Sequence, residues 1–178
     1  MSYNNCFDDL PNYSENACGI NKIPGISAVA IIDKDHGFTD FSNAAQWTAQ
    51  IAAGNVKIIK EIKATYVQAS PVTAANPRAR GAANVLMKLE HTLNVEDPNV
   101  DSNNDTFYET LNGRETYLAW YNFEEDEIRV VVLPVTWTCL PATDDLNADF
   151  QKYVNTAQWR SAPDEFPTLY TAPAGIFG

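Results

Sequence analysis

Apolar and polar residues alternate along residues 83–95, and this is the clearest structural pattern in the chain. The odd positions of this stretch are apolar except for His91, whereas the even positions are polar except for Leu86. A period of two places one set of side chains on a buried face of a strand and the other set in water. Similar stretches elsewhere predict a mainly β protein with a minor helical part, built as an antiparallel sandwich or barrel with a flanking helix and extended terminal arms.

The remaining pattern predicts two helices and several further strands. The first helix spans 40–53, because Asp40 or Ser42 can cap its start and a glycine follows its end. A short second helix is expected at 106–113, where Thr106 and Glu109 have the spacing of a capping box. Part of residues 55–69 also fits a helix, although their Ile and Val content favours a strand. Strands are expected at 23–33, 55–69, 82–95, 115–123, 127–139 and 152–161, with a hairpin joining 115–123 to 127–139.

These elements predict one β-rich domain at residues 23–161 with a different kind of segment at each end. Residues 1–22 are rich in Asn, Asp and Ser without periodicity, so we expect an irregular N-terminal arm. Residues 70–81 contain two prolines and are expected to form a long exposed loop inserted in the domain. Residues 162–178 combine three prolines with large apolar side chains. Such a C-terminal tail either folds back onto its own domain or docks on a neighbour.

Composition places the chain among globular proteins with a strong negative charge. The 178 residues are 45% hydrophobic and 20% charged, which is enough for one domain with a real core. The net charge of −11 argues against a surface that grips phosphate, but it allows nucleic acid to pass without sticking. No apolar run reaches the roughly 20 residues of a membrane span, and no secretory signal is visible, so we expect synthesis in the cytoplasm.

Candidate chemistry is sparse, and each candidate has an ordinary structural explanation. Asp33, Asp35, His36 and Asp40 are close in sequence and could ligate a metal or transfer protons, but turns between a strand and a helix favour the same residues. His91 lies on the apolar face of its strand, where a hydrogen-bonded core histidine is expected. We therefore expect no enzyme activity, no catalytic residue and no cofactor.

Residues 97–105 alternate Asp and Asn in the manner of a calcium-binding loop. Ser102 stands where such a loop needs glycine, and Tyr108 stands where it needs a bidentate glutamate. An Asx-rich connection is the simpler interpretation, so no metal site is expected. The three cysteines, at 6, 18 and 139, fit no closed disulfide framework, and Cys139 is expected in the core.

The order of elements and four short motifs resemble the tail-tube (major tail) proteins of tailed phages. The motifs are Thr39-Asp40-Phe41-Ser42 with Trp47, Phe107-Tyr108-Glu109-Thr110-Leu111-Asn112, Gln158-Trp159-Arg160-Ser161 and Pro173-Ala174-Gly175-Ile176-Phe177. In that family a small sandwich or barrel assembles into stacked rings around a channel through which the genome passes. The resemblance implies a non-enzymatic virion subunit that is made in the host cytoplasm. Its partners would be copies of itself and other virion proteins, with DNA only as non-sticking cargo and no membrane.

The same resemblance implies where subunits would meet. Rings of that family stack through a long loop and through the chain termini, which here correspond to residues 70–81 and the two ends. The candidate subunit-interface residues are Arg78, Arg80, Tyr170, Ile176 and Phe177.

Other functions remain open at this point. A connector ring, a tail terminator or a capsid-associated protein would leave a similar sequence trace. A monomeric β-sandwich module could bind a carbohydrate or a protein through exposed aromatics such as Trp120 or Tyr121. A small hydrolase or metal enzyme would use Asp33, Asp35 and His36 together with residues 97–105.

Overall fold

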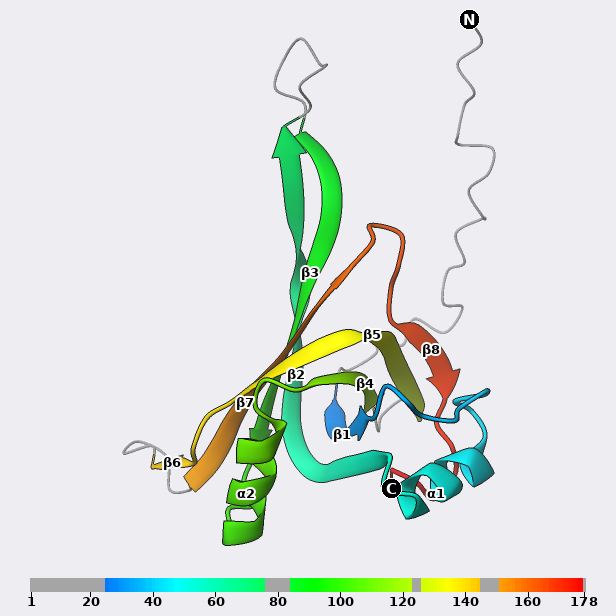
Figure 1. Cartoon of the computed structure of the whole chain (residues 1–178), viewed down its shortest axis with the longest axis vertical. Helices are drawn as coiled ribbons and strands as arrows, with labels where there is room; N and C mark the ends of the chain where they lie inside the picture. The colour runs from blue at the N-terminus through cyan, green and yellow to red at the C-terminus, as the bar shows by residue number, and fades with distance from the viewer. Residues whose placement is uncertain (1–24, 76–83, 123–125, 145–150, 178) are drawn as a thin grey trace, which may run out of the picture.

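The computed structural model describes residues 25–75, 84–122, 126–144 and 151–177, which form a mainly β domain with two helices (Figure 1). The expected N-terminal arm at 1–22, with Cys6 and Cys18, lies outside these residues. In chain order the elements are β1 (Ile26–Ile32), α1 (Ala44–Ala52), β2 (Val56–Ala75), β3 (Asn84–Asp97), α2 (Ser102–Leu111), β4 (Glu115–Asn122), β5 (Glu127–Cys139), β6 (Thr143–Asp144), β7 (Gln151–Ser161) and β8 (Thr168–Thr171).

Six of these strands close into an antiparallel barrel. Their order is β7-β3-β2-β1-β4-β5, and β5 returns to β7, where residues 136–139 pair with residues 155–158. The short strands β6 and β8 lie beside β7 and β5. Closure gives each barrel strand two neighbours, which removes the open edges that invite uncontrolled pairing. Of the two architectures expected from the sequence, the barrel is confirmed and the sandwich is wrong.

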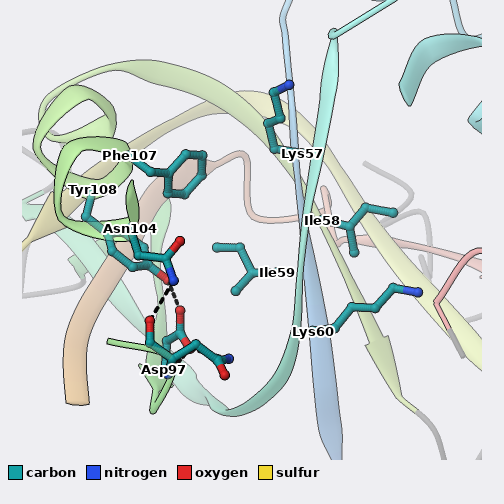
Figure 2. Close-up of a pocket in the computed structure, with 9 residues that line it drawn as sticks. Lys57, Ile58, Ile59, Lys60, Asp97, Asn104, Phe107 and Tyr108 are labelled. Carbon is teal, nitrogen blue, oxygen red and sulfur yellow. Dashed lines mark hydrogen bonds between the residues drawn. The ribbon is translucent and has the colours of Figure 1, made fainter. Parts of the chain in front are cut away.

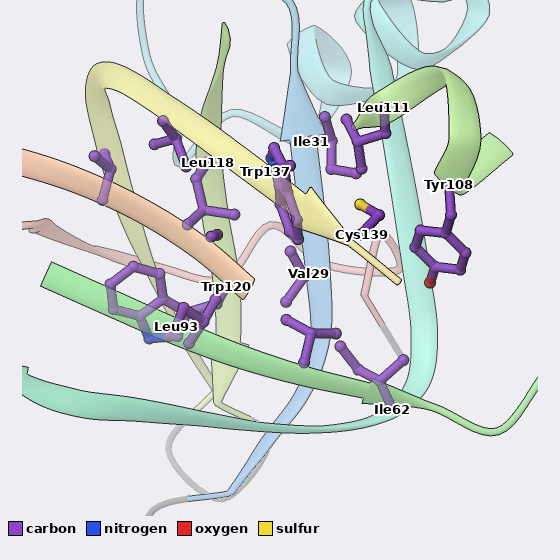
Figure 3. Close-up of a cluster of buried hydrophobic side chains, with 14 of the residues drawn as sticks. Val29, Ile31, Ile62, Leu93, Tyr108, Leu111, Leu118, Trp120, Trp137 and Cys139 are labelled. Atoms are coloured by element: carbon purple, nitrogen blue, oxygen red, sulfur yellow. The ribbon is translucent and has the colours of Figure 1, made fainter. Parts of the chain in front are cut away.

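The barrel interior holds the main hydrophobic core (Figure 3). All six barrel strands contribute side chains to this core, and Tyr108 and Leu111 of α2 join them at one end. On β3, the buried positions are His91, Leu93, Val95 and Asp97, whereas the positions between them are more exposed. The alternation predicted for residues 83–95 is therefore confirmed over residues 91–95, whereas the buried position predicted for Met87 is wrong, because Met87 is 54% exposed.

A second core lies on the outer side of β1, beneath α1. Val29 of β1 packs in the barrel core, whereas Ala28 and Ile32 pack in the second core with Trp47 of α1. The Trp47 side chain is fully buried, and its indole N–H donates to the carbonyl oxygen of Phe41 at 2.7 Å. A strand covered on both faces needs apolar residues at every position, which explains the unbroken apolar run at residues 28–32 of this strand.

Both helices exist as predicted, but their first residues differ from the prediction. α1 starts at Ala44 because Asn43, not Asp40 or Ser42, accepts from the amides of the first turn. α2 starts at Ser102, capped by Asp101, whose carboxylate accepts from the Asn104 amide at 2.8 Å.

The capping box expected at residues 106–109 is wrong. Thr106 lies inside α2, and its hydroxyl donates to the Ser102 carbonyl oxygen one turn earlier. The spacing of Thr106 and Glu109 matches the motif, but the Asx-rich stretch before it already provides a cap, so the helix begins a turn sooner.

The predicted loop at 70–81 is wrong in its first half. β2 continues through Ala75, and its residues 70–75 pair with β3. The pairing register shifts between Val67 and Ser70 and again between Val72 and Thr73. Such irregularities accommodate Pro71, which cannot donate to a strand ladder. The second half of the predicted loop, with Arg78 and Arg80, lies outside the described residues.

The C-terminal tail folds back onto its own domain, which is one of the two outcomes expected from the sequence. Residues 168–171 form β8, which pairs with residues 127–130 of β5. Phe177 is buried in the second core, where its ring lies 5.0 Å from Trp47 and 5.3 Å from Tyr121.

Candidate functional site: a hairpin arm and an acidic pocket

The longest hairpin of the protein projects beyond the barrel as a two-stranded arm (Figure 1). β1 pairs with β2 only as far as Ala64, and β7 pairs with β3 only as far as Leu89. Beyond these points the described strand residues pair only with each other. We call residues 67–75 and 84–88, the described part of this hairpin beyond the barrel, the arm. Nine strand residues on its β2 side give a length of roughly 30 Å at about 3.3 Å per residue.

The arm exposes apolar side chains to solvent. Val67 is 41% exposed, Val72 37%, Leu86 40% and Met87 54%. These four are among the most exposed large hydrophobic residues of the described chain, and neighbouring arm positions are also exposed. A ribbon with two exposed faces has no core of its own, and an isolated two-stranded hairpin is only marginally stable in water.

The sequence range that contains the arm also differs in charge from the rest of the protein. Residues 67–88 contain Arg78, Arg80 and Lys88 and no acidic residue, whereas the whole chain has 23 acidic and 12 basic side chains. The net charge is therefore +3 on residues 67–88 and −14 on the remaining residues, which together give the −11 of the chain. Opposite charges of this kind favour contact between the arm of one molecule and the body of another.

The base of the arm is fixed by a hydrogen-bonded chain across three strands. The Tyr66 hydroxyl lies 2.6 Å from His91 Nδ1, and His91 Nε2 lies 2.8 Å from Ser161 Oγ. Ser161 Oγ donates to the Ala162 carbonyl oxygen, so its lone pair can accept from Nε2–H, and in a neutral ring Nδ1 then accepts from the Tyr66 hydroxyl. The His91 ring lies parallel to Trp159 at a centroid distance of 5.0 Å. Burial lowers the pKa of His91, which is consistent with this neutral tautomer. The expected core histidine is confirmed.

At the opposite end of the barrel from the arm, α2 is fixed by a second polar network (Figure 1). Asp97, at the end of β3, is 2% exposed, and its Oδ2 accepts from the Tyr108 hydroxyl at 2.6 Å. Its Oδ1 accepts from the backbone amide and the side-chain amide of Asn99, both at 2.8 Å. The Tyr153 hydroxyl of β7 donates to Asp105 Oδ1 at 2.7 Å. Burial and these carboxylates raise the pKa of Tyr108 and raise that of Tyr153 to about 12, so both hydroxyls stay protonated.

A cavity lies on each side of α2. The first, of about 370 Å³, lies between α2 and β2 (Figure 2). Figure 2 shows Phe107 and Ile59 side by side above Asp97, with Lys57 and Lys60 farther along β2. The polar groups at its floor already bond to one another, because Asp97 accepts from both Tyr108 and Asn99.

The second cavity, of about 590 Å³, lies between α2, the end of β5 and the start of β7. Two carboxylates of α2, those of Asp105 and Glu109, line it, and no Lys, Arg or His side chain of the described chain does. Tyr108 and Tyr153 supply aromatic walls, and Leu140 is among its apolar residues. Its size is within the range of ligand pockets, which run from about 300 to 1,000 Å³. We call it the acidic pocket.

The acidic side chains suggested for chemistry act in local structure. Asp33 Oδ1 accepts from the Asp35 amide, and Asp40 Oδ1 accepts from the Ser42 amide and hydroxyl. Asp101 caps α2. In residues 25–75, 84–122, 126–144 and 151–177, no three or more His, Cys, Asp or Glu side chains are grouped so that they could hold a metal ion.

His36 is a packing residue at the turn before α1. Its ring contacts Phe38, Phe41 and Tyr117 at centroid distances of 5.4, 5.6 and 5.5 Å. Burial lowers the pKa of His36, and the nearby Asp33 carboxylate partly offsets this. The polar turn expected between the strand and the helix is therefore what the structure shows.

The aromatic residues suggested for ligand binding are mostly covered. Trp120 is 4% exposed inside the barrel, so the prediction that it is an exposed aromatic is wrong. Tyr121 is partly buried under Phe177. Cys139 lies in the core as expected, and it also lines the acidic pocket; burial raises its thiol pKa to about 11.

The candidate interface residues fall into two groups. Arg78 and Arg80 lie outside the described residues, although the strands that lead to them form the arm. Tyr170, Ile176 and Phe177 pack against the same chain, with Tyr170 and Phe177 contacting Phe41 and Trp47. A contact of these three residues with another subunit stays a prediction.

Two features of the site have no signal in the sequence. The acidic pocket draws its lining from three elements that are separated by up to some fifty residues, and no spacing rule connects them. The β2 half of the arm lacks clean alternation, and the alternation that reaches into its β3 half does not reveal that Leu86 and Met87 are both exposed. Among the described residues, no helix is long and apolar enough to cross a membrane.

Comparison with known proteins gives little further information. No protein-family model and no curated protein matches the chain. One solved chain, from a structure described as "Tail of empty GTA particle computed with helical refinement, C6 symmetry", is similar over 68% of this chain and 90% of its own length. The sequence identity is 11% and the TM-score is 0.38, and a likeness at this level carries no argument about function.

Proposed function

We propose that this protein is a non-enzymatic structural subunit of a tailed-phage virion, of the tail-tube type. It self-assembles into stacked rings around a channel for genome passage. The observation that carries the self-assembly is the arm, with Leu86 and Met87 among its exposed apolar residues. Exposed apolar groups on a projecting element mark an interaction site.

The physical argument for self-assembly combines hydrophobic burial with pairing of backbone groups. Beyond the barrel, the outer edges of the two arm strands have no partner strand among the described residues. Unpaired strand edges bind other strands readily, and most soluble oligomers are made of identical subunits with closed symmetry. Contact with other copies would cover both the edges and the apolar faces of the arm.

The resemblance to tail-tube proteins supports the virion part of the proposal. The motifs that carry this resemblance lie in the turn before α1, in α2, at the end of β7 and in the C-terminal segment. The excess of acidic residues fits a channel through which DNA moves without binding. The partners would be other copies and other virion proteins, and the mature location would be the virion after synthesis in the host cytoplasm. We propose no cofactor and no membrane partner.

The test is to image the full-length protein and to weaken the arm. Negative-stain images and light scattering of concentrated wild-type protein are expected to show rings or stacks of rings. The triple variant Val72→Ser, Leu86→Ser and Met87→Ser is expected to remain folded and monomeric. Val132→Ser is the matched control, because Val132 is also exposed but lies on the barrel wall.

A wild-type protein that stays monomeric at high concentration, with and without virion partners, would contradict the proposal. The symmetry and channel width in the images would separate a tube from a connector or terminator ring. A duplex DNA that binds tightly at moderate salt would contradict its role as non-sticking cargo.

A further inference from the structure

We infer that His36 is a proton-operated latch on residues 36–41, the loop that lies against the second core just before α1. The loop is closed while the imidazole is neutral, and it opens when the ring takes up a proton. This conformational device goes beyond the proposed function, which gives the second core no role.

The loop is held by hydrogen bonds to side chains. Four successive backbone amides, those of residues 37–40, all donate to side-chain acceptors. In chain order the acceptors are Gln50 Oε1, His36 Nδ1 and, for the last two amides, Gln46 Oε1, at 3.3, 3.0, 2.9 and 3.2 Å. Glutamine oxygens do not titrate in water, so His36 supplies the acceptor of this set that a proton can remove.

The hydrogen bond from the Phe38 amide fixes the tautomer of His36. A ring nitrogen that accepts a hydrogen bond carries a lone pair, so the proton of the neutral ring is on Nε2. In the charged ring both nitrogens carry protons, and Nδ1–H would then face the Phe38 N–H. Rotating the ring by half a turn would bring a carbon-bound hydrogen to the same place. The Phe38 amide loses its acceptor in either orientation, so this part of the loop must move.

The loop packs its aromatic rings against α1 and the C-terminal segment. The Phe38 ring lies 4.8 Å from Phe41 and 4.9 Å from Trp47 of α1, measured between ring centroids. Phe41 lies 5.6 Å from Tyr170 of β8, and its carbonyl oxygen accepts from the Trp47 indole. Movement of the loop at Phe38 therefore loosens the cover of the second core.

The surroundings of His36 favour the neutral ring. Burial disfavours the charged form and lowers the pKa of His36 below its ordinary value of 6.5. The Asp33 carboxylate of the same turn acts in the opposite direction but is the weaker influence. Tyr117 is the ionisable side chain of β4 in contact with the ring, and α1 contributes no charged residue. The latch is therefore closed at neutral pH and opens in acid.

Hydrogen exchange of the Phe38 amide, corrected for the intrinsic exchange rate at each pH, tests the inference. In the wild type we expect its protection to fall about tenfold between about pH 7.5 and about pH 4.5, as for the loss of one hydrogen bond. His36→Asn keeps an acceptor, because an asparagine oxygen bonds the amide two residues on, so its protection is expected to stay constant. His36→Gln carries its oxygen one bond farther from the backbone, so low protection is expected at both pH values.

The ionisation of His36 is measured in the same samples. Exchange of the imidazole C2 hydrogen, followed by mass spectrometry, reports the charge on the ring. The variant His91→Gln separates this signal from that of the other histidine of the chain. Amides of β4 are the internal control, because opening of the loop is expected to leave their protection unchanged.

Three results would overturn the inference. The first is a charged His36 with an unchanged Phe38 amide, and the second is a ring that stays neutral down to about pH 4.5. The third is a loss of protection that is equal in the wild type and His36→Asn, or that extends to β4, because carboxylate titration or unfolding of the domain would then be the cause. These measurements do not depend on self-assembly, so failure of the latch leaves the proposed function standing.

Discussion

His91 connects two barrel strands through a neutral imidazole, and this makes stability depend on pH. Burial lowers the pKa of His91 below its ordinary value of 6.5, because the charged form loses hydration inside the barrel. As the pH falls below 6.5, the unfolded chain binds a proton that the folded chain excludes. The contribution of His91 to the free energy of unfolding is therefore expected to be fully present above pH 6.5. It is expected to fall as the pH drops toward the folded-state pKa of His91.

Urea unfolding at several pH values, with wild type and His91→Gln, measures this contribution. Glutamine can accept from Tyr66 and donate to Ser161 without titrating. The wild-type protein is expected to lose more stability than the variant between neutral and mildly acidic pH. His36 is present in both proteins, so its effect cancels in the comparison. Equal losses in the two proteins would show that His91 takes up its proton in the folded state without penalty.

Tyr108 supports a buried carboxylate, so loss of its hydroxyl is expected to be costly. In Tyr108→Phe, Asp97 Oδ2 loses the donor that lies 2.6 Å away in a site shielded from water. We expect the free energy of unfolding to fall by about 2 kcal/mol, as for other hydrogen bonds to charged groups. Tyr121→Phe is the control, because that hydroxyl bonds to Asp126 at 3.2 Å in an exposed position, and its removal is expected to cost under about 0.5 kcal/mol. Similar losses in both variants would contradict a special role for the Asp97 network.

At the scale of elements, the C-terminal segment holds α1 on the barrel. Phe177 contributes to the second core beside Trp47, so Phe177→Ala is expected to leave a cavity and to lower the free energy of unfolding by about 3 kcal/mol. Phe166→Ala is the matched control, since Phe166 is 66% exposed and its loss is expected to be nearly neutral. Total tryptophan fluorescence under denaturant follows the unfolding of both variants. A neutral Phe177→Ala would indicate that the segment leaves its own domain in solution.

The extents of strands with a buried face could be predicted from the sequence. The extents of strands with both faces exposed could not. The long strand β3 shows its alternation only where the barrel covers it, over residues 91–97. The extension of β2 to Ala75 was missed because exposed strands have no hydrophobic period, and because Pro71 favours a loop. The start of α2 was missed because the spacing of Thr106 and Glu109 matches a capping box, whereas Asp101 caps the helix one turn earlier.

The candidate site could be predicted only in its charges. The acid-free stretch around Arg78 and Arg80 is visible in the sequence, and so are the carboxylates of Asp105 and Glu109. That Tyr153 lies against Asp105 depends on barrel closure. Long-range strand pairing is set by the burial of many side chains together, and no local pattern encodes it.

At the scale of the whole molecule, assembly must overcome repulsion between bodies that each carry a large negative charge. Outside residues 67–88 the net charge is −14, and this repulsion acts over distances comparable with the Debye length of about 10 Å at 0.1 M salt. Contacts of the arm are short-range, and apolar groups supply part of them, so salt weakens them less. We therefore expect added sodium chloride to strengthen wild-type self-association in sedimentation velocity.

The variant Arg78→Ser with Arg80→Ser carries two fewer positive charges, so its association is expected to be weaker at low salt and to gain more from added salt. Dissociation of the wild-type assembly by moderate salt would contradict this balance and would show that ion pairs, and not apolar contacts, hold the subunits together.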